Sequence, residues 1–429
     1  MRKLTFSGGI HPPEFKSLTA GIPITEAPAP KIAIIPLSQH TGAPAKPVVK
    51  VGDAVKVGTK IGEAQGFISA NIHATISGVV KKIDLYSHPV LGEAQAVFIE
   101  SDGKDEWETH TEERNYKDLS TDELIAIVRE AGIVGLGGAA FPTSVKLSPP
   151  KGKTIDTVIL NGAECEPYLT ADHRLMLERA AEIIEGGRII LKILGARKGY
   201  IAIEENKPDA ISKMSKFKDF ELCVMRTKYP QGAEKQLIKA ITGREVPSGG
   251  LPFDVGAYVQ NVGTAFAIYE AVKFGKPLVA RVVTVTGAVK KPKNLRVRIG
   301  TIFHDLIESC GGSLNAAKII MGGPMMGIAQ PTDEVPVIKG TSGILVQSEQ
   351  EVETAVEAPC IRCGRCVKIC PMNLVPVQIA DYVERKRFNE AKELGVLDCI
   401  ECGSCAYVCP ARRTLVHLFK YAKEELRKK

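Results

Sequence analysis

The sequence predicts a multidomain chain that combines α+β and α/β structure with a separate cysteine-rich C-terminal domain. A chain of 429 residues is too long for a single hydrophobic core. Short Val/Ile runs broken by glycines fill residues 31–100, and strand and helix signals alternate over 117–275. One cysteine pattern then occurs twice between residue 360 and the end of the chain. These three observations divide the chain into its expected domains.

Residues 31–115 are expected to form a β-rich module that follows an N-terminal extension, residues 1–30. The GD and GT steps in KPVVKVGDAVKVGTK are turn signals between alternating strands. The pattern resembles the barrel-sandwich hybrid of biotinyl and lipoyl carriers, which bear a lysine at the tip of a hairpin. The corresponding tip here, near Ser69, Ala70 and Asn71, contains no lysine. We therefore expect a docking role and not a carrier role.

Residues 116–275 are expected to form an α/β domain. A helix signal at 121–132 precedes the glycine-rich segment GLGGAAFPTSVK at 135–146. Such a turn lets backbone N–H groups approach a phosphate or a ring closely, because a side chain would collide. Lys146 adds a positive charge at the end of this segment. The segment matches neither the Rossmann pattern nor a Walker P-loop.

Polar residues follow four successive strand or turn signals of this domain. They are Asn161, Glu164 and Glu166 after TVIL, the acids of YIAIEENKP (200–208), Glu234 in the helix that starts within 229–243, and Gln260 and Asn261. Each of these side chains could be a helix cap or a turn residue. Functional polar groups collect at the carboxyl ends of strands in α/β sheets. Four such clusters therefore favour one shared site.

Residues 276–345 show strand signals, a glycine turn and a short helix, and resemble the small soluble-ligand-binding β-grasp (SLBB) domain. A structural spacer is favoured here over a vitamin-binding role. Met321, Met325 and Met326 are interpreted as packing residues. The acidic segment 349–359 is expected to be a linker within the last domain, residues 346–429.

The pattern C-x2-C-x2-C-x3-C-P stands at 360–371 and again at 399–410. In bacterial-type ferredoxins three thiolates of such a run bind one [4Fe-4S] cluster, and the fourth crosses to the other. The two expected ligand sets are Cys360, Cys363, Cys366 and Cys409, and Cys399, Cys402, Cys405 and Cys370. A zinc ribbon needs ligands in two pairs, and a disulfide framework suits a small secreted domain. The domain is therefore predicted to transfer single electrons.

Composition excludes several functions. The formal charge of +7 would fall to about +3 with two clusters bound, and the chain has one tryptophan and no basic stripe, so nucleic-acid binding is not expected. No apolar stretch approaches the ~18 residues of a membrane span, and the N-terminus lacks a signal peptide. We expect a reducing compartment. The cations near the cluster loops could steer an acidic partner or merely offset cluster charge; they are Arg362, Arg365, Lys368, Arg412 and Arg413.

Several ordered motifs together resemble one family. GLGGAAFPTSVK, NGAECEP, YPQGAEK and VQNVGT are similar to motifs of the FMN- and NADH-binding flavoprotein subunit of respiratory complex I. The order of modules adds to this resemblance: an N-terminal GGIHPPE, a barrel-sandwich domain, the flavin domain and two ferredoxin motifs. In that order the chain is similar, over nearly its whole length, to the RnfC component of the Rnf ion-translocating electron-transport complexes.

The resemblance implies FMN, NAD(H) and two [4Fe-4S] clusters as cofactors. It also implies hydride exchange between NAD(H) and FMN, with no side-chain catalyst. The implied FMN contacts are Gly135, Gly137, Gly138, Lys146, Asn161, Glu164, Gly232, Gln260, Asn261 and Thr264. The implied nucleotide contacts are Phe141, Glu166 and Glu234. Ala163 and Ala233 stand where the complex I subunit has acids, so fewer polar contacts are expected.

The same resemblance implies a peripheral subunit of a ferredoxin:NAD+ oxidoreductase on the cytoplasmic side of the cell membrane. The implied partners are multispanning membrane subunits and a ferredoxin-type subunit. The alternatives are the flavin subunit of a soluble NADH-linked hydrogenase and a cobalamin reductase. The first usually carries one C-terminal cluster motif. In the second the flavin motif lies near the N-terminus, whereas here more than a hundred residues precede it.

Overall fold

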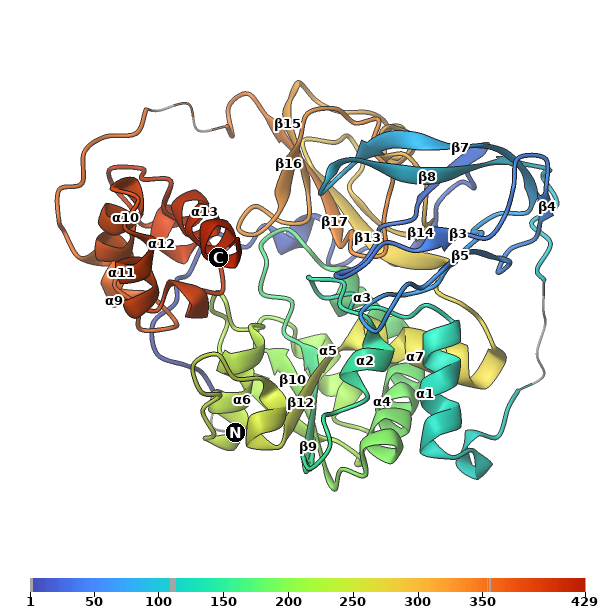
Figure 1. Ribbon diagram of the computed structural model, residues 1–429, viewed down its shortest axis with the longest axis horizontal. Coiled ribbons are helices and arrows are strands. Elements are labelled where there is room, and N and C mark those ends of the chain that lie inside the picture. The colour runs from blue at the N-terminus through green and yellow to red at the C-terminus, as the bar shows by residue number, and fades with distance from the viewer. Residues whose placement is uncertain (1–2, 109–112, 353, 355, 429) are drawn as a thin grey trace.

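The computed structural model describes residues 3–108, 113–352, 354 and 356–428. Figure 1 shows an α/β domain at the bottom, two β-rich domains above it and a helical C-terminal domain at the left. Residues 353 and 355, which belong to the expected acidic linker, lie outside the described residues. No helix in the described part of the chain is long and apolar enough to cross a membrane.

The α/β domain contains a parallel sheet of four strands in the order β11-β10-β9-β12. These are β9 (Thr157–Gly162), β10 (Lys198–Glu204), β11 (Glu221–Met225) and β12 (Ala257–Asn261). The strand order reverses between β9 and β12, and in open α/β sheets ligands bind in the crevice at the carboxyl ends of such strands. Asn161 and Asn261 are register partners there, so both side chains reach the same edge of the sheet. The shared site expected from the sequence has a structural basis at this point.

Helices cover both faces of this sheet. One face packs against α1 (Thr121–Glu130), α4 (Ala180–Leu194) and α7 (Val262–Phe274), and the other packs against α6 (Glu234–Thr242). The alternation of β9 explains both contacts, since Val158 and Leu160 face the first group and Ile159 faces α6. The shorter helices are α2 (Thr143–Lys146), α3 (Ala171–Glu178) and α5 (Pro208–Met214). The helix expected from residue 121 is confirmed, with a capping box at Ser120.

The barrel-sandwich domain consists of two small sheets around a shared core that includes Ile35, Ile61 and Val97. One sheet contains β2 (Ile32–Pro36), β8 (Gly92–Ser101), β7 (Gly78–His88) and β4 (Ala54–Val55), and the other contains β3 (Lys46–Pro47), β5 (Lys60–Glu63) and β6 (Ile72–His73). The hairpin tip around Asn71 is buried inside the molecule. The Nζ atom of Lys339 donates to the carbonyls of Asn71 and Gly132, both at 2.7 Å. The tip is therefore a docking contact within the chain.

The β-grasp domain is a sheet of six strands with α8 (Phe303–Ser309) packed on it through Phe303 and Leu306. In sheet order the strands are β1 (Thr25–Glu26), β14 (Lys293–Arg298), β13 (Ala280–Gly287), β17 (Gly343–Ser348), β15 (Ala316–Met321) and β16 (Ile328–Gln330). β1 comes from the N-terminal extension and pairs with β14 in parallel. β17 runs past residue 345, where the sequence places the end of this domain.

The C-terminal domain is helical over its described residues. It contains α9 (Arg365–Lys368), α10 (Pro376–Glu384), α11 (Phe388–Glu393), α12 (Ser404–Tyr407) and α13 (Leu415–Arg427). Its core includes Ile379, Leu415 and Phe419. α9 and α12, one within each cysteine motif, lie in contact, so the helices bring the two motifs together. Short 3-10 helices occur at Lys16–Leu18, Tyr116–Asp118, Pro252–Val255 and Val396–Asp398.

The N-terminal segment runs between the α/β domain and the helical domain. Leu4 bridges to Met225 at the edge of the parallel sheet, and Ile10 bridges to Tyr229. The backbone N–H of Gly9 donates to the carbonyl of Ile369 at 2.7 Å. These contacts join three parts of the chain that are far apart in sequence.

Candidate functional site

The glycine-rich loop lies against the start of α7. The N–H of Gly135 donates to the carbonyl of Phe141 at 2.9 Å and closes the loop, and the N–H of Leu136 donates to Oγ1 of Thr264 at 2.8 Å. A Cβ added at Gly137 would lie 3.0 Å from Cβ of Asn261, so a larger residue there would force Asn261 to shift. Gly138 faces open space. The exposed loop backbone is therefore available to a ligand at the strand ends.

The side-chain amides at the ends of β9 and β12 are hydrogen-bonded to other groups of the protein. Nδ2 of Asn161 donates to the carbonyl of Gly232 at 2.9 Å, and Oδ1 of Asn261 accepts from the N–H of Thr264 at 3.1 Å as the N-cap of α7. Oε1 of the buried Gln260 accepts from the Tyr258 hydroxyl at 2.6 Å. These amides are thus fixed in orientation. Rigid donors and acceptors of this kind suit a pre-formed cofactor site.

Lys146 and Glu234 lie together, although the sequence assigns them to different ligands. Nζ of Lys146 is 2.6 Å from Oε1 of Glu234 and donates to the carbonyl of Val259 at 2.6 Å. The cation is therefore largely neutralised by its own chain.

Glu164 and Glu166 also bind protein groups. The carboxylate of Glu164 accepts from the N–H groups of Asp172 at 2.7 Å and His173 at 3.0 Å, and so caps the N-terminus of α3. The carboxylate of Glu166 accepts from the N–H groups of Met325 and Met326 in the loop after β15. Burial raises the pKa of Glu166 to about 7. The structure places Glu164 at a helix cap and Glu166 at a contact with the β-grasp domain.

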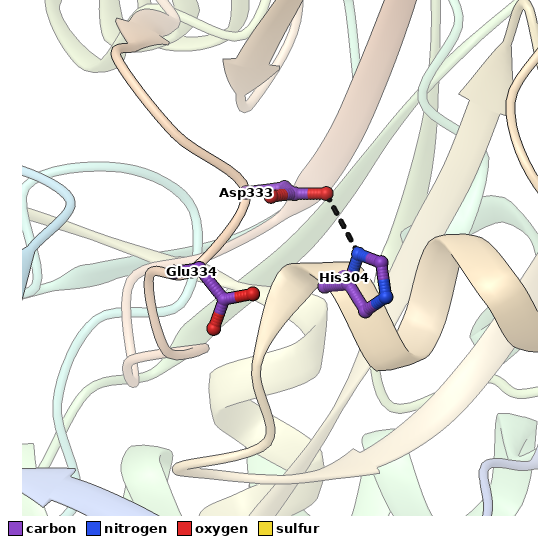
Figure 2. Close-up of side chains that lie close together, drawn as sticks. All are labelled: His304, Asp333 and Glu334. Atoms are coloured by element: carbon purple, nitrogen blue, oxygen red, sulfur yellow. Dashed lines mark hydrogen bonds and ion pairs between the residues drawn. The ribbon is translucent and has the colours of Figure 1, made fainter.

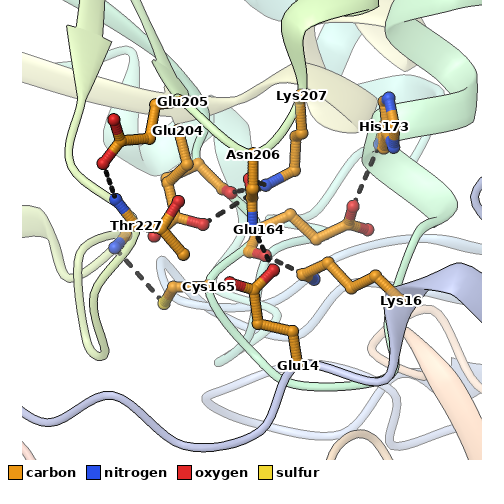
Figure 3. Close-up of polar contacts among 12 residues, drawn as sticks. Glu14, Lys16, Glu164, Cys165, His173, Glu204, Glu205, Asn206, Lys207 and Thr227 are labelled. Atoms are coloured by element: carbon orange, nitrogen blue, oxygen red, sulfur yellow. Dashed lines mark hydrogen bonds and ion pairs between the residues drawn. The ribbon is translucent and has the colours of Figure 1, made fainter.

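Two buried lysines fix the backbone of the NGAECEP motif, as Figure 3 shows. Nζ of Lys16 donates to the carbonyls of Glu164, Glu166 and Leu169 at 2.6–2.9 Å. Nζ of Lys207 donates to the carbonyl of Ala163 at 2.6 Å and is ion-paired with Glu204. Lysines are rarely buried unless they are paired. These two lysines pair with backbone carbonyls and hold the motif in one conformation.

Lys16 and Lys207 were not singled out from the sequence, although both stand in or beside motifs that were. Lys16 follows GGIHPPEF, and Lys207 lies within YIAIEENKP. Arg281 was missed as well. Its guanidinium donates to the carbonyls of Lys339 at 2.5 Å and Leu136 at 3.3 Å. The second bond holds the glycine-rich loop, which contains Leu136. Burial raises the pKa of the neighbouring Asp172, whose carboxylate accepts from Asn261 at 2.7 Å.

One predicted cysteine set surrounds a single small cavity. Cys370, Cys399, Cys402 and Cys405 line a space of about 20 Å³ whose apolar wall includes Leu374 and Phe419. Two backbone N–H groups point at these sulfurs, from Leu374 to Cys370 and from Glu401 to Cys399, each at 3.4 Å. Burial, and to a smaller extent the nearby sulfurs, raises the pKa of Cys399 to about 11. Four thiolates there need a cationic core, as an iron–sulfur cluster provides.

The other set lies nearer the surface. Cys363 is exposed, and Cys360, Cys366 and Cys409 are half-buried. Cys366 lies on α9, which contacts α12 just before Cys409, and burial together with the Cys409 sulfur raises the pKa of Cys366. The structure thus brings the fourth cysteine of each run toward the other run.

The geometry argues against the zinc and disulfide alternatives. All eleven cysteines are unpaired. Among the described residues no three cysteine sulfurs lie within 4.8 Å of one another. A single zinc ion with Zn–S bonds of about 2.3 Å would bring its sulfurs to about 3.8 Å. The donor sets fit a wider, thiolate-bound group.

A direct contact joins the α/β domain, which carries the flavin candidate site, to the inner cysteine cavity. The hydroxyl of the buried Tyr229 donates to the carbonyl of Cys402 at 2.7 Å. Tyr229 packs in one apolar cluster with Cys165 and Cys402. On α6, Nε2 of Gln236 donates to the carbonyl of Pro371 at 3.1 Å. The inner cavity therefore adjoins the α/β domain, and the outer set lies beyond it.

A further group of potential metal ligands lies on the β-grasp domain. Figure 2 shows His304, Asp333 and Glu334 with their side chains close together. Nδ1 of His304 is 2.9 Å from Oδ2 of Asp333, and this carboxylate raises the pKa of the imidazole. Because His304 and Glu334 are exposed, an ordinary surface ion pair accounts for the arrangement.

Comparison with protein families matches four consecutive parts of the chain. They are the RnfC barrel sandwich hybrid domain (4–104), the Nuo51 FMN-binding domain (128–270), the SLBB domain (282–329) and a 4Fe-4S dicluster domain (354–410). The predicted fold class, with its four kinds of domain, is confirmed by these matches. The FMN-binding match covers the glycine-rich loop and every strand end of the crevice.

Two solved structures of an NAD+-reducing [NiFe]-hydrogenase share 16% identity with the chain. Their TM-scores are 0.46 and 0.47, over 72% and 70% of this chain and 61% and 63% of theirs. At this level of similarity they carry no functional information.

Curated relatives match over nearly the full length. The chain is 54% identical to the RnfC-type component of a proton-translocating ferredoxin:NAD(+) oxidoreductase complex from Clostridium ljungdahlii, over 99% of this chain and 94% of the relative. It is 48% identical to the same component of the Na(+)-translocating complex from Acetobacterium woodii, over 98% and 97%. It is 43% identical to that of an ion-translocating oxidoreductase complex from Rhodobacter capsulatus, over 99% and 84%. The chain belongs to the RnfC family, the C subunits of ion-translocating ferredoxin:NAD(+) oxidoreductase complexes.

Proposed function

We propose that this chain is the peripheral electron-transfer subunit of a membrane-bound ion-translocating ferredoxin:NAD+ oxidoreductase. In this function it exchanges hydride between NAD(H) and FMN, and single electrons with two [4Fe-4S] clusters. The observation that carries the proposal is the direct contact through Tyr229 between a crevice of the FMN-binding type and a cavity lined by four cysteines. The RnfC-type domain at 4–104 favours this function over the hydrogenase and cobalamin reductase alternatives.

The crevice suits FMN because its backbone is rigid and its loop is open. The proposed FMN contacts are those implied by the sequence: Gly135, Gly137, Gly138, Lys146, Asn161, Glu164, Gly232, Gln260, Asn261 and Thr264. A bound flavin supplies chemistry that links the two-electron nicotinamide to one-electron carriers. The chain contributes a fixed position, since the buried Lys16 and Lys207 hold the NGAECEP backbone and Asn261 caps α7.

The proposed nucleotide contacts are Phe141, Glu166 and Glu234. Glu166 accepts from two backbone N–H groups and Glu234 from Lys146, and each carboxylate keeps lone pairs for a ligand. With alanine at positions 163 and 233, these two acids supply the carboxylates proposed to contact the nucleotide.

Burial suggests an order for the two clusters. Of the inner set, Cys402 is 7% exposed and its carbonyl is bonded to Tyr229, whereas Cys363 of the outer set is exposed. We assign the inner set to the cluster next to the flavin and the outer set to the cluster that faces a partner.

Reduction of bound flavin by NADH tests the proposal. Protein reconstituted with FMN under anaerobic conditions should lose its flavin absorbance on addition of NADH. A variant with Cys370→Ser and Cys409→Ser, which lacks both clusters, should still lose it, because the flavin crevice is intact. Protein that binds FMN but is reduced by neither NADH nor NADPH would contradict the electron-entry role.

The family places the chain in a multisubunit complex associated with a membrane. The finer proposal is attachment on the cytoplasmic side, where NADH is present, through multispanning subunits and a ferredoxin-type subunit. Expressed alone, the chain should remain in the soluble fraction, and co-expressed with its partner subunits it should sediment with membranes. Salt-resistant membrane binding of the isolated chain would contradict attachment through partners.

A further inference from the structure

A large cleft lies between the helical domain and the loop that joins β15 and β16, which also touch each other where Met325 packs against Cys402. In Figure 1 this loop and α13 face each other across the upper left of the molecule. The cleft has a volume of about 1150 Å³. Its walls include Lys318 on β15, Met325 and Met326 in the loop, Tyr407 on α12, and Lys420 on α13.

Positive charge dominates the walls of this cleft. The charged residues are Lys318, Arg365, Arg412, Arg413 and Lys420, against one carboxylate, Glu401. Glu401 is ion-paired with Lys423 at 2.6 Å, so little of its charge reaches the cleft. Arg413 is paired with Glu357 and Glu384. Within the described part of the chain, Lys318, Arg365 and Lys420 form no ion pair.

Neutralisation of a cluster does not explain all of these cations. Lys318 belongs to a strand of the β-grasp domain and Lys420 lies on α13, both outside the cysteine motifs. Two exposed apolar side chains accompany them, since Met326 and Tyr407 are 53% and 52% exposed. Exposed aromatic and methionine side chains are enriched at protein-binding surfaces, and the unpaired cations beside them favour an acidic partner.

The cleft also reaches a proposed cluster ligand. Cys409 lines it, together with Pro410 and Val408 of the same motif. Cys409 is the fourth cysteine of the second run and is assigned to the outer set with Cys360, Cys363 and Cys366. A partner seated in the cleft therefore approaches the outer cluster through one of its own ligands.

We propose that this cleft is the docking surface for an acidic iron–sulfur protein or protein domain, and this proposal rests on the proposed function. In the docked complex one electron passes between the partner's reduced cluster and the oxidised outer cluster, or in the reverse direction. No bond forms or breaks, and the loss of one electron by one cluster equals the gain by the other. A flat anionic membrane does not fit a concave surface between two domains, so the occupant is a protein.

Binding measurements on the full chain with FMN and both clusters test the docking surface. The probe is a purified small acidic two-cluster ferredoxin, and its dissociation constant is measured at low and high salt. Lys318→Glu combined with Lys420→Glu should weaken binding about tenfold or more at low salt, because repulsion replaces attraction. The difference should shrink as salt screens the charges.

A matched control carries two charge reversals, one on each of the same two domains. Lys392 on α11 and Lys291, between β13 and β14, are exposed and lie outside the cleft. Lys291→Glu combined with Lys392→Glu should bind the ferredoxin as the unmodified chain does. Equal binding of the ferredoxin by the cleft variant and the control would overturn the docking site. Binding to phosphatidylserine vesicles is measured alongside, and a cleft variant that loses only vesicle binding would overturn the docking site as well. Because binding is the readout, this result is independent of whether NADH reduces the flavin.

Discussion

The contact between Tyr229 and Cys402 gives a quantitative prediction. Tyr229→Phe removes a buried hydroxyl that donates to the Cys402 carbonyl at 2.7 Å, and it leaves that carbonyl without a protein donor. A buried acceptor that loses its partner costs about 1–3 kcal/mol. The ring remains, so the apolar packing with Ile10 and Cys402 is kept. The lost stabilising free energy should therefore affect the junction between the α/β domain and the inner cysteine cavity.

Hydrogen–deuterium exchange is the suitable assay, because a multidomain chain has no single unfolding free energy. In Tyr229→Phe, amides of the segment 399–409 should exchange about 5- to 150-fold faster, as 1.4 kcal/mol corresponds to a factor of ten. Tyr407→Phe is the matched control, since Tyr407 is 52% exposed in the same domain and should change exchange very little. Equal exchange in the two variants would refute the proposed junction.

Three further predictions follow from the site. Glu166→Gln should flatten the pH dependence of local stability, measured as hydrogen-exchange protection factors of the Met325 and Met326 amides, which donate to this carboxylate. In the unmodified chain the raised pKa, about 7 against an ordinary 4.5, means that stability falls by up to about 3 kcal/mol as pH rises through this window. The double variant Cys370→Ser/Cys399→Ser should retain about four irons by metal analysis under the crossed assignment, whereas uncrossed ligation predicts loss of both clusters. Gly137→Ala should weaken FMN binding in fluorescence titration because its Cβ meets Asn261, while Gly340→Ala, whose Cβ makes only ordinary contacts, should bind normally.

Local signals in the sequence were sufficient for the elements of the α/β domain. The strand before Asn161 became β9, and the helix expected after the 229–233 turn became α6. The meeting of Asn161 and Asn261 could be predicted because parallel strands end at one edge of a sheet. The crossed cysteine sets stay a prediction from the spacing, and the structure places Cys370 beside Cys399, Cys402 and Cys405 around one cavity.

Long-range contacts could not be predicted in this way. The extension at 1–30 showed no periodic pattern, yet Lys16 is buried beneath the NGAECEP motif and residues 25–26 complete the β-grasp sheet. The family resemblance implied FMN as the ligand of Lys146 and the nucleotide as the ligand of Glu234, and the structure pairs the two side chains at 2.6 Å. Such pairings depend on how the domains pack, and a short sequence pattern contains no information about that packing.

Electron transfer from the clusters to NAD+ through the flavin tests the central claim most directly. The chain with FMN and both clusters is reduced chemically, freed of reductant and mixed with NAD+ under anaerobic conditions. We predict that NADH forms and that the cluster signals in electron paramagnetic resonance disappear, whereas protein without FMN stays reduced. Clusters that remain reduced with FMN and NAD+ both bound would contradict the account.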